Sequence, residues 1–186
     1  KRLAKKGFEL AMTRSKKLCC VDKANVLETS RLWRETVQTM EKEYPEVTVS
    51  YEFVDAVAMR LVQWPNSYDV LITENLFGDI LTDEASVISG SMGLMPSASV
   101  GEHTSLYEPI HGSYPQATGL DIANPLATVL SAAMMFEDAF GLIDEAKAIR
   151  DVVDKSLAEG IVTEDLAEKN KAYKTSEVGD WLASHI

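Results

Sequence analysis

The chain has 186 residues and a formal net charge of −11 at pH 7. This acidic balance opposes general attraction to phosphate backbones or anionic lipid surfaces, so we expect neither nucleic acid nor a membrane as a partner. Hydrophobic residues make up 46% of the chain without an apolar run long enough to cross a bilayer, which is typical of a cytoplasmic globular protein.

In the first half of the chain, helical patterns alternate with short apolar strands. The expected elements are, in order, a helix at 1–15, a strand at 16–23, a helix at 25–42, a strand at 47–55, a helix at 55–63, a strand at 68–74, and a helix that carries Asp79 and Asp83. This alternation predicts an α/β fold with a parallel or mixed sheet.

The second half changes in composition. Residues 90–124 are rich in Gly, Pro, Ser and Tyr, and a segment of this length is more typical of a binding loop than of a simple connection. Helices are expected again at 124–141, with Pro125 in the first turn, at 142–160, ending at Gly160, and at 177–186.

The two cysteines, Cys19 and Cys20, are adjacent in an apolar strand. This placement suits a reduced compartment better than a disulfide, and no other Cys or nearby His completes a metal-binding set. The sequence also opens in the middle of a helical pattern without a methionine or a signal-peptide core, so we expect it to be a piece of a longer protein.

The most informative pattern is the pair Asp79 and Asp83. On a helix these carboxylates lie one turn apart on the same side, where they repel unless a cation or a proton lies between them. Oxygen ligands suit Mg²⁺ or Mn²⁺ rather than Zn²⁺. Since such pairs are common on exposed helices, a solvated face is the alternative. The apolar residues around the pair predict a mostly buried helix, in which bare carboxylates would be costly, and this favours a metal site.

Two further charged residues follow predicted strands, where α/β proteins often present functional groups. Asp55 begins a helix directly after a strand, so it is either a third carboxylate of the site or a helix N-cap. Lys23 ends an earlier strand. It is either simply solvated, or it lies beside a metal, where a lowered pKa would let it help to remove a hydroxyl proton.

Several long segments resemble the isocitrate/isopropylmalate family of β-decarboxylating dehydrogenases. In the family's order and spacing these are "VDKANVLETSRLWRE", "YDVLITENLFGDILTDEASVISGSMGLMPSAS", "YEPIHGS" and "DIANPLATVLSAAMM". Phe77 and the residues of "YEPIHGS" resemble the isopropylmalate-oxidising members more than the isocitrate-oxidising ones.

The resemblance implies the isocitrate/isopropylmalate dehydrogenase-like fold, which is not a classical Rossmann fold, and a homodimer with shared active sites. It assigns Asp79 and Asp83 as metal ligands, joined by Asp55 of a second copy. Lys23 would reach across the interface as the catalytic residue that assists removal of the hydroxyl proton. Lys23, Asp55 and Asp79 would also contact the substrate.

The implied reaction is the oxidative decarboxylation of 3-isopropylmalate to 4-methyl-2-oxopentanoate. It would use NAD and Mg²⁺ or Mn²⁺ and belong to leucine biosynthesis, when the chain is part of the full-length enzyme. Two alternatives stay open. One is a related 2-hydroxy-acid decarboxylating dehydrogenase acting on isocitrate, homoisocitrate or tartrate, and the other is a non-catalytic fragment for dimerisation or nucleotide binding.

By resemblance, residues 108–124 are the family's coenzyme loop, which has no GxGxxG. The residues implied for NAD binding are Glu108, His111, Gly112, Ser113, Gln116 and Asn124. His111 would lie near the adenine, with a surface hydrogen-bonding histidine as the alternative. Gln116 stands where NAD-specific members usually have an aspartate, so it can bond the ribose diol but does not repel a 2′-phosphate. Asp121 would then supply the missing charge.

The resemblance also places residue 1 near the middle of the family's chain. Residues 1–89 would form most of the smaller, dimer-forming α/β domain, and residues 90–186 the C-terminal part of the larger coenzyme-binding domain. Dimerisation is expected through helices near 26–40 and 79–88. The residues that grip the substrate's carboxylates and select its isopropyl group would lie in the missing half, so the piece alone is expected to be inactive.

Overall fold

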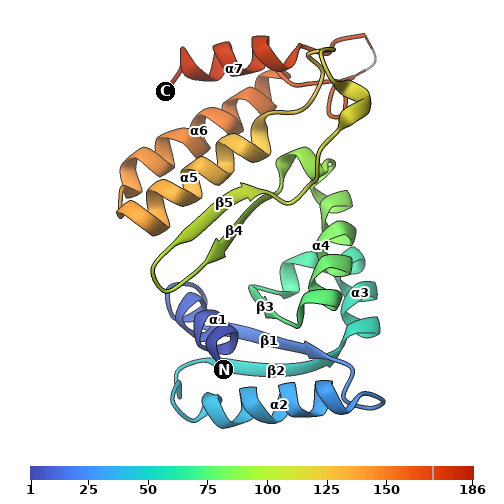
Figure 1. Cartoon of the computed structure of the whole chain (residues 1–186), viewed down its shortest axis with the longest axis vertical. Helices are drawn as coiled ribbons and strands as arrows, with labels where there is room; N and C mark the ends of the chain where they lie inside the picture. Colours follow the sequence, from blue (N-terminus) through green and yellow to red (C-terminus); the bar gives the residue numbers. More distant parts are fainter. Residues whose placement is uncertain (169) are drawn as a thin grey trace. The chain divides into compact units, whose positions relative to one another are not determined.

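The computed structural model describes residues 1–168 and 170–186 (Figure 1). The chain divides into two compact units, Lys1–Ala85 and Ser86–Ile186. The first unit contains a three-stranded parallel sheet, and the second contains a two-stranded antiparallel hairpin with three helices. No helix in these described ranges is long and apolar enough to cross a membrane.

The sheet of the first unit has the order β2-β1-β3. Its strands are β1 (Lys17–Asp22), β2 (Thr48–Phe53) and β3 (Val70–Ile72), and both pairings are parallel, as predicted. The central strand β1 is buried from Leu18 onward, which explains its nearly continuous apolar sequence. Its two cysteines are buried free thiols, and burial raises the pKa of Cys19 to about 11 and that of Cys20 to about 12.

Four helices cover the two faces of this sheet: α1 (Arg2–Met12), α2 (Glu28–Glu41), α3 (Val54–Gln63) and α4 (Asn75–Ser89). Side chains of β1 alternate between two cores because successive residues of a strand point to opposite faces. Leu18 and Cys20 join the core with α1 and α2, which contains Phe8 and Val37. Cys19 and Val21 join the core with α3 and α4, which contains Val57, Leu61 and Leu81.

The first residue of helix α3 corrects the interpretation of Asp55 as a helix N-cap. Helix α3 begins at Val54 with Phe53 as its N-cap residue, so Asp55 lies inside the first turn and is not the N-cap. The reason is that the extended backbone of β2 ends at Phe53, two residues earlier than the strand expected at 47–55. A carboxylate in the first turn still interacts favourably with the helix dipole.

The prediction of a mostly buried helix around the acids is also wrong. Leu81 of α4 is only 4% exposed, but Ile80 is 56% exposed and Val87 78% exposed. In the described chain, α4 therefore buries a narrow side around Leu81 and leaves other apolar residues open to solvent.

The second unit contains a hairpin where the sequence predicted a binding loop. Strands β4 (Pro96–Val100) and β5 (Ser105–Pro109) pair antiparallel, with Pro96 opposite Pro109 and Val100 opposite Ser105. Both strands pack against helix α5 (Leu126–Phe140). The loop prediction was thus wrong for these residues, because pairing and packing stabilise strands that are poor in large apolar side chains.

The remaining elements of this unit are two short 3-10 helices, Met92–Leu94 and Pro115–Ala117, and helices α5, α6 (Ile143–Glu159) and α7 (Thr175–Ala183). Gly160 ends α6 in the left-handed conformation, as its position predicted. Pro125 is the N-cap residue of α5 and lies just before its first turn. Leu126, Val153, Val178 and Leu182 belong to the core shared by α5, α6 and α7.

Candidate active site

Asp79 and Asp83 lie one turn apart on α4, and both are exposed. The side-chain amide of Asn75 donates a hydrogen bond to Asp79 Oδ2 at 3.2 Å. The nearby hydroxyl of Thr82 bonds to the carbonyl oxygens of Gly78 and Asp79, so it does not occupy the carboxylates. Two accessible carboxylates at this spacing are suited to a hard divalent cation.

The two carboxylates by themselves do not make a complete set of metal ligands. Among residues 1–168 and 170–186, no three His, Cys, Asp or Glu side chains lie close enough together to hold a metal ion. Asp55 therefore does not join Asp79 and Asp83 within one chain. The donor chemistry of the pair fits Mg²⁺ or Mn²⁺, but the described residues bring no third ligand of this kind to it.

Lys23 and Asp55, in contrast, are brought together. Lys23 Nζ lies 2.5 Å from Asp55 Oδ1 and 5.7 Å from the centre of the Phe53 ring. The two residues follow β1 and β2, adjacent parallel strands whose carboxyl ends share one edge of the sheet. The hydrogen bond from Lys23 lowers the pKa of Asp55 below its ordinary value. The result is an oriented pair of opposite charges at this edge.

A buried ion pair that the sequence analysis missed supports the turn carrying Lys23. Asp22 is 1% exposed and accepts hydrogen bonds from Arg34 Nε at 2.7 Å and Arg34 Nη2 at 3.1 Å. It also accepts one from the Ala24 backbone N–H at 2.8 Å. A charged residue ending an apolar strand was the only sequence signal for it, and that signal did not identify Arg34 as the partner.

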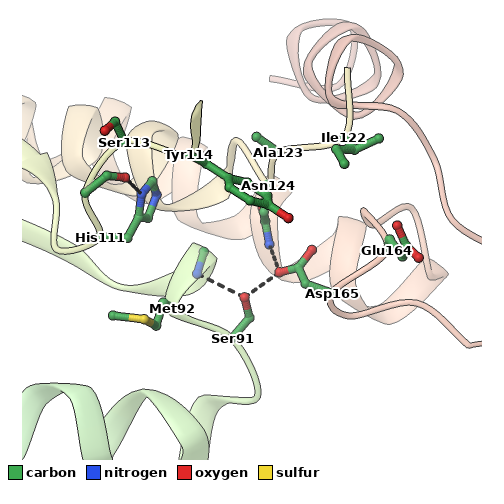
Figure 2. Close-up of a pocket in the computed structure, with 12 residues that line it drawn as sticks. Ser91, Met92, His111, Ser113, Tyr114, Ile122, Ala123, Asn124, Glu164 and Asp165 are labelled. Atoms are coloured by element: carbon green, nitrogen blue, oxygen red, sulfur yellow. Dashed lines mark hydrogen bonds between the residues drawn. The ribbon is translucent and has the colours of Figure 1, made fainter. Parts of the chain in front are cut away.

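The second unit contains a cavity of about 640 Å³. It is lined by Ser91, Met92, Gly93, His111, Gly112, Ser113, Tyr114, Ile122, Ala123, Asn124, Glu164 and Asp165. Figure 2 shows the lining coming from the segment after α4, from the loop between β5 and α5, and from the segment after α6. The cavity therefore gathers parts of the second unit that are far apart in the sequence.

Four of the six predicted coenzyme residues line this cavity: His111, Gly112, Ser113 and Asn124. His111 Nδ1 lies 3.0 Å from the Gly112 carbonyl oxygen. Because that oxygen only accepts, Nδ1 is the donor there and a neutral ring keeps Nε2 as an acceptor. The other two predicted residues are outside the lining: Glu108 lies in β5 opposite Ser97, and Gln116 lies exposed in the short helix Pro115–Ala117.

Asn124 is fixed at both ends of its amide. Its Oδ1 accepts a hydrogen bond from the Leu126 N–H, and its Nδ2 donates one to Asp165 Oδ2, each at 2.9 Å. Asp165 also accepts a hydrogen bond from the hydroxyl of Ser91 (Figure 2). It accepts a further one from the hydroxyl of Thr163 at 2.5 Å. Partial burial alone would raise the pKa of Asp165, but these three donors more than offset it and hold the pKa below its ordinary value.

Gly93 lies against the same network. A Cβ built on Gly93 would come within 2.6 Å of Asn124 Cβ, so only glycine leaves Asn124 in its place. The Gly93 N–H donates to Ser91 Oγ at 2.9 Å. The base of the cavity is therefore a connected set of hydrogen bonds between three separate segments.

The comparisons with known proteins agree with this architecture. The model of the isocitrate/isopropylmalate dehydrogenase family matches residues 1–182. The chain belongs to this family. The match confirms the resemblance and, with the structural similarities below, the predicted fold.

Relatives with sequence similarity include two bacterial enzymes. The chain is 56% identical over 186 residues to the 3-isopropylmalate dehydrogenase of Bacteroides fragilis (strain YCH46), covering 100% of this chain and 52% of that protein. It is 52% identical over 188 residues to the 3-isopropylmalate dehydrogenase of Clostridium acetobutylicum, covering 100% of this chain and 53% of that protein. The chain thus spans about half the length of the curated relatives it matches.

Solved structures are similar over the same extent. An isocitrate dehydrogenase from Methylococcus capsulatus matches with a TM-score of 0.94 and 37% identity, over 99% of this chain and 55% of that chain. A beta-decarboxylating dehydrogenase from Thermococcus kodakarensis matches with a TM-score of 0.87 and 35% identity, over 99% of this chain and 53% of that chain.

In this chain of the isocitrate/isopropylmalate dehydrogenase family, Asp121 contacts the start of α7. Its carboxylate accepts hydrogen bonds from the Ser176 N–H at 3.0 Å and the Ser176 hydroxyl at 2.6 Å, at the start of α7. These donors lower the pKa of Asp121. Asp121 lies outside the cavity lining, whereas Glu164 and Asp165, which the sequence analysis missed, are part of it.

Proposed function

We propose that this chain is the C-terminal half of an oxidoreductase that converts 3-isopropylmalate to 4-methyl-2-oxopentanoate. The enzyme would use NAD and Mg²⁺ or Mn²⁺, and it would act in leucine biosynthesis in the cytoplasm. The observation that carries the proposal is the 56% identity, over all 186 residues, to a relative named 3-isopropylmalate dehydrogenase.

The metal site would combine Asp79 and Asp83 of one chain with Asp55 of a second copy. The spacing of Asp79 and Asp83, one turn apart on the same side of α4, supports this assignment because it lets both carboxylates approach one cation. When bound, the cation would polarise the substrate's hydroxyl and neighbouring carboxylate. Asp55 and Asp79 would also orient the substrate.

Lys23 would be the catalytic residue that helps to remove the hydroxyl proton. Its ion pair with Asp55 at 2.5 Å orients the amino group. Lys23 would assist this proton transfer through a relay. The buried Asp22–Arg34 pair would position Lys23 without touching the substrate.

The cavity of the second unit would bind the adenosine part of NAD. Its size, and the presence of His111, Gly112, Ser113 and Asn124 in its wall, support this assignment. Glu108 and Gln116 belong to the same proposed coenzyme region, although they lie outside this cavity in the chain alone. Residues 90–186 would accordingly be part of the coenzyme-binding domain.

Residues 1–89 would form the dimer. Exposed apolar side chains on two helices support this: Leu32 of α2 is 66% exposed, and Leu76 and Ile80 of α4 are 63% and 56% exposed. Open apolar side chains gathered on particular elements are typical of surfaces that a partner covers. A dimer of this kind would complete two active sites, each with residues of both chains.

The test of the metal site is a calorimetric titration of the chain with Mn²⁺. We expect saturable binding that disappears in the double variant Asp79→Asn/Asp83→Asn, because the cation loses both carboxylates. The matched control is Asp154→Asn/Asp180→Asn, which removes the same charge from exposed positions on α6 and α7. Equal binding by both double variants would contradict the assignment. A well-folded dimer without Mn²⁺ binding would exclude a preassembled site.

A second candidate is a related 2-hydroxy-acid decarboxylating dehydrogenase. The TM-score of 0.94 to an isocitrate dehydrogenase favours it. The full-length enzyme would decide between the substrates: we expect faster NAD reduction with 3-isopropylmalate than with isocitrate, homoisocitrate or tartrate. A full-length protein that oxidises none of them would favour a non-catalytic role in dimerisation or nucleotide binding.

A further inference from the structure

Among the described residues, the charged side chains that line the cavity of the second unit are all acidic. Within the described part of the chain, its lining contains two carboxylates, Glu164 and Asp165, and no lysine or arginine. Both acids come from the segment that follows α6, whereas His111 and Asn124 come from the region before α5. Figure 2 shows Glu164 and Asp165 on one side of the cavity and His111 and Ser113 on the other.

The acidic side of the cavity is held in place by hydrogen bonds. Thr163, buried at 1% exposure, donates to Asp165, and Asp165 accepts from Ser91 and Asn124 across the cavity base. Glu164 lies between these two anchored residues, so its backbone is fixed beside the cavity. The side chain of Glu164 is exposed and lines the same space.

A phosphate monoester carries a charge of about −1.5 to −2 near pH 7. Placed beside these two carboxylates, with no lysine or arginine among the described residues of the lining, it would be repelled by their charge. NADP differs from NAD by such a group on the 2′-oxygen of the adenosine ribose. Gln116, at the position expected to discriminate, is neutral and lies outside the lining.

We propose that Glu164 is the residue that makes this cavity reject a 2′-phosphorylated adenosine, and so sets the preference for NAD over NADP. The inference rests on the proposed function, in which this cavity binds the coenzyme's adenosine. Asp165 contributes background negative charge, but its main task is to position Asn124 and Ser91 through hydrogen bonds. Glu164 is therefore the residue to change.

The test compares 5′-AMP with adenosine 2′,5′-bisphosphate, which differ by the 2′-phosphate, in titrations of the 186-residue chain followed by amide NMR signals. We expect 5′-AMP to shift signals of residues 111–114 and 122–124, and the bisphosphate to bind roughly tenfold more weakly. In Glu164→Gln the bisphosphate should gain about tenfold, while 5′-AMP is unchanged. Glu168→Gln is the matched control, since it removes the same charge from an exposed residue outside the cavity lining.

The salt dependence of nucleotide binding distinguishes charge repulsion from a change in the shape of the cavity. At roughly 1 M salt, where the Debye length is about 3 Å, the difference between the two nucleotides should shrink in the wild-type chain. If 5′-AMP binds in the cavity, but Glu164→Gln prefers it to the bisphosphate by the same factor as the wild-type chain does, the inference is overturned. The assignment of the cavity to the coenzyme is then unaffected. A folded chain in which 5′-AMP shifts no cavity signal would overturn both.

Discussion

Asp69 connects the end of α1 to the start of β3 through three hydrogen bonds. It accepts from Arg14 Nε at 2.6 Å, from the Ser15 N–H at 2.9 Å and from the Ser15 hydroxyl at 2.5 Å. The Ser15 hydroxyl and Arg14 are the main reasons that the pKa of Asp69 falls from its ordinary 3.8 to about 2. This carboxylate therefore stabilises the first unit only while it is ionised.

The lowered pKa of Asp69 predicts a pH dependence of stability. Because the folded pKa lies below the unfolded one, the stabilisation is present above about pH 4 and is lost as the pH falls through about 2. Asp69→Asn should lower the free energy of unfolding at pH 7 and show a smaller further loss between pH 4 and 2. Urea unfolding across this range measures it, with Asp180→Asn as an exposed control. Parallel pH profiles for wild type and Asp69→Asn would contradict the prediction.

The buried Asp22–Arg34 ion pair leads to a second prediction, which concerns the free energy of unfolding. Arg34→Met leaves the buried carboxylate of Asp22 without its cation, which should lower the free energy of unfolding by roughly 3 kcal/mol, at the low end for a buried pair because Arg34 itself is only partly buried. Arg31→Met on the same helix breaks an exposed pair with Glu28 and a hydrogen bond from Arg31 Nε to the Ala24 carbonyl oxygen, together worth about 1 kcal/mol. Chemical denaturation of both variants checks the difference. Equal losses would show that the buried position of Asp22 does not matter.

At the scale of elements, the packing of α1 on β3 depends on Gly7. A Cβ on Gly7 would lie 2.3 Å from Ile72 Cγ2, and Ile72 is only 4% exposed. Gly7→Ala should therefore push α1 away from the sheet and cost roughly 1–3 kcal/mol of stability. Gly179→Ala in α7 meets nothing within 4 Å and should stabilise by about 0.5–1 kcal/mol. Thermal denaturation checks both, and destabilisation by both would mean that contact with Ile72 is not the cause.

The elements differ in how well the sequence predicted them. The helices and the parallel strands of the first unit were expected because their apolar residues repeat at helical spacing or form short buried runs. The hairpin β4–β5 was missed because strands such as "PSASV" lack that pattern. Its stability comes from pairing with β5 and packing against α5, which are contacts made after the chain has turned back.

At the scale of the whole molecule, the exposed apolar residues of α2 and α4 predict a dimer. Light scattering of the chain should give twice the mass of 20.5 kDa. Leu32→Asp/Ile80→Asp should give a monomer, because charges would be buried in the interface. Leu120→Asp, at a position 57% exposed in the other unit, is the control and should leave the dimer intact. A monomeric wild-type chain would contradict the proposed shared active sites.

The sequence by itself determined the family, the α/β class, and the candidates Lys23, Asp79 and Asp83, because long motifs and local spacing can be read along the chain. Only the tertiary structure showed that Lys23 pairs with Asp55, and that the cavity wall includes Glu164 in place of Gln116. The Lys23–Asp55 pair and the Asn124–Asp165 hydrogen bond each join residues that are 32 or more positions apart in the sequence. Such contacts depend on how the chain folds back on itself, and no local pattern of side chains encodes that closure.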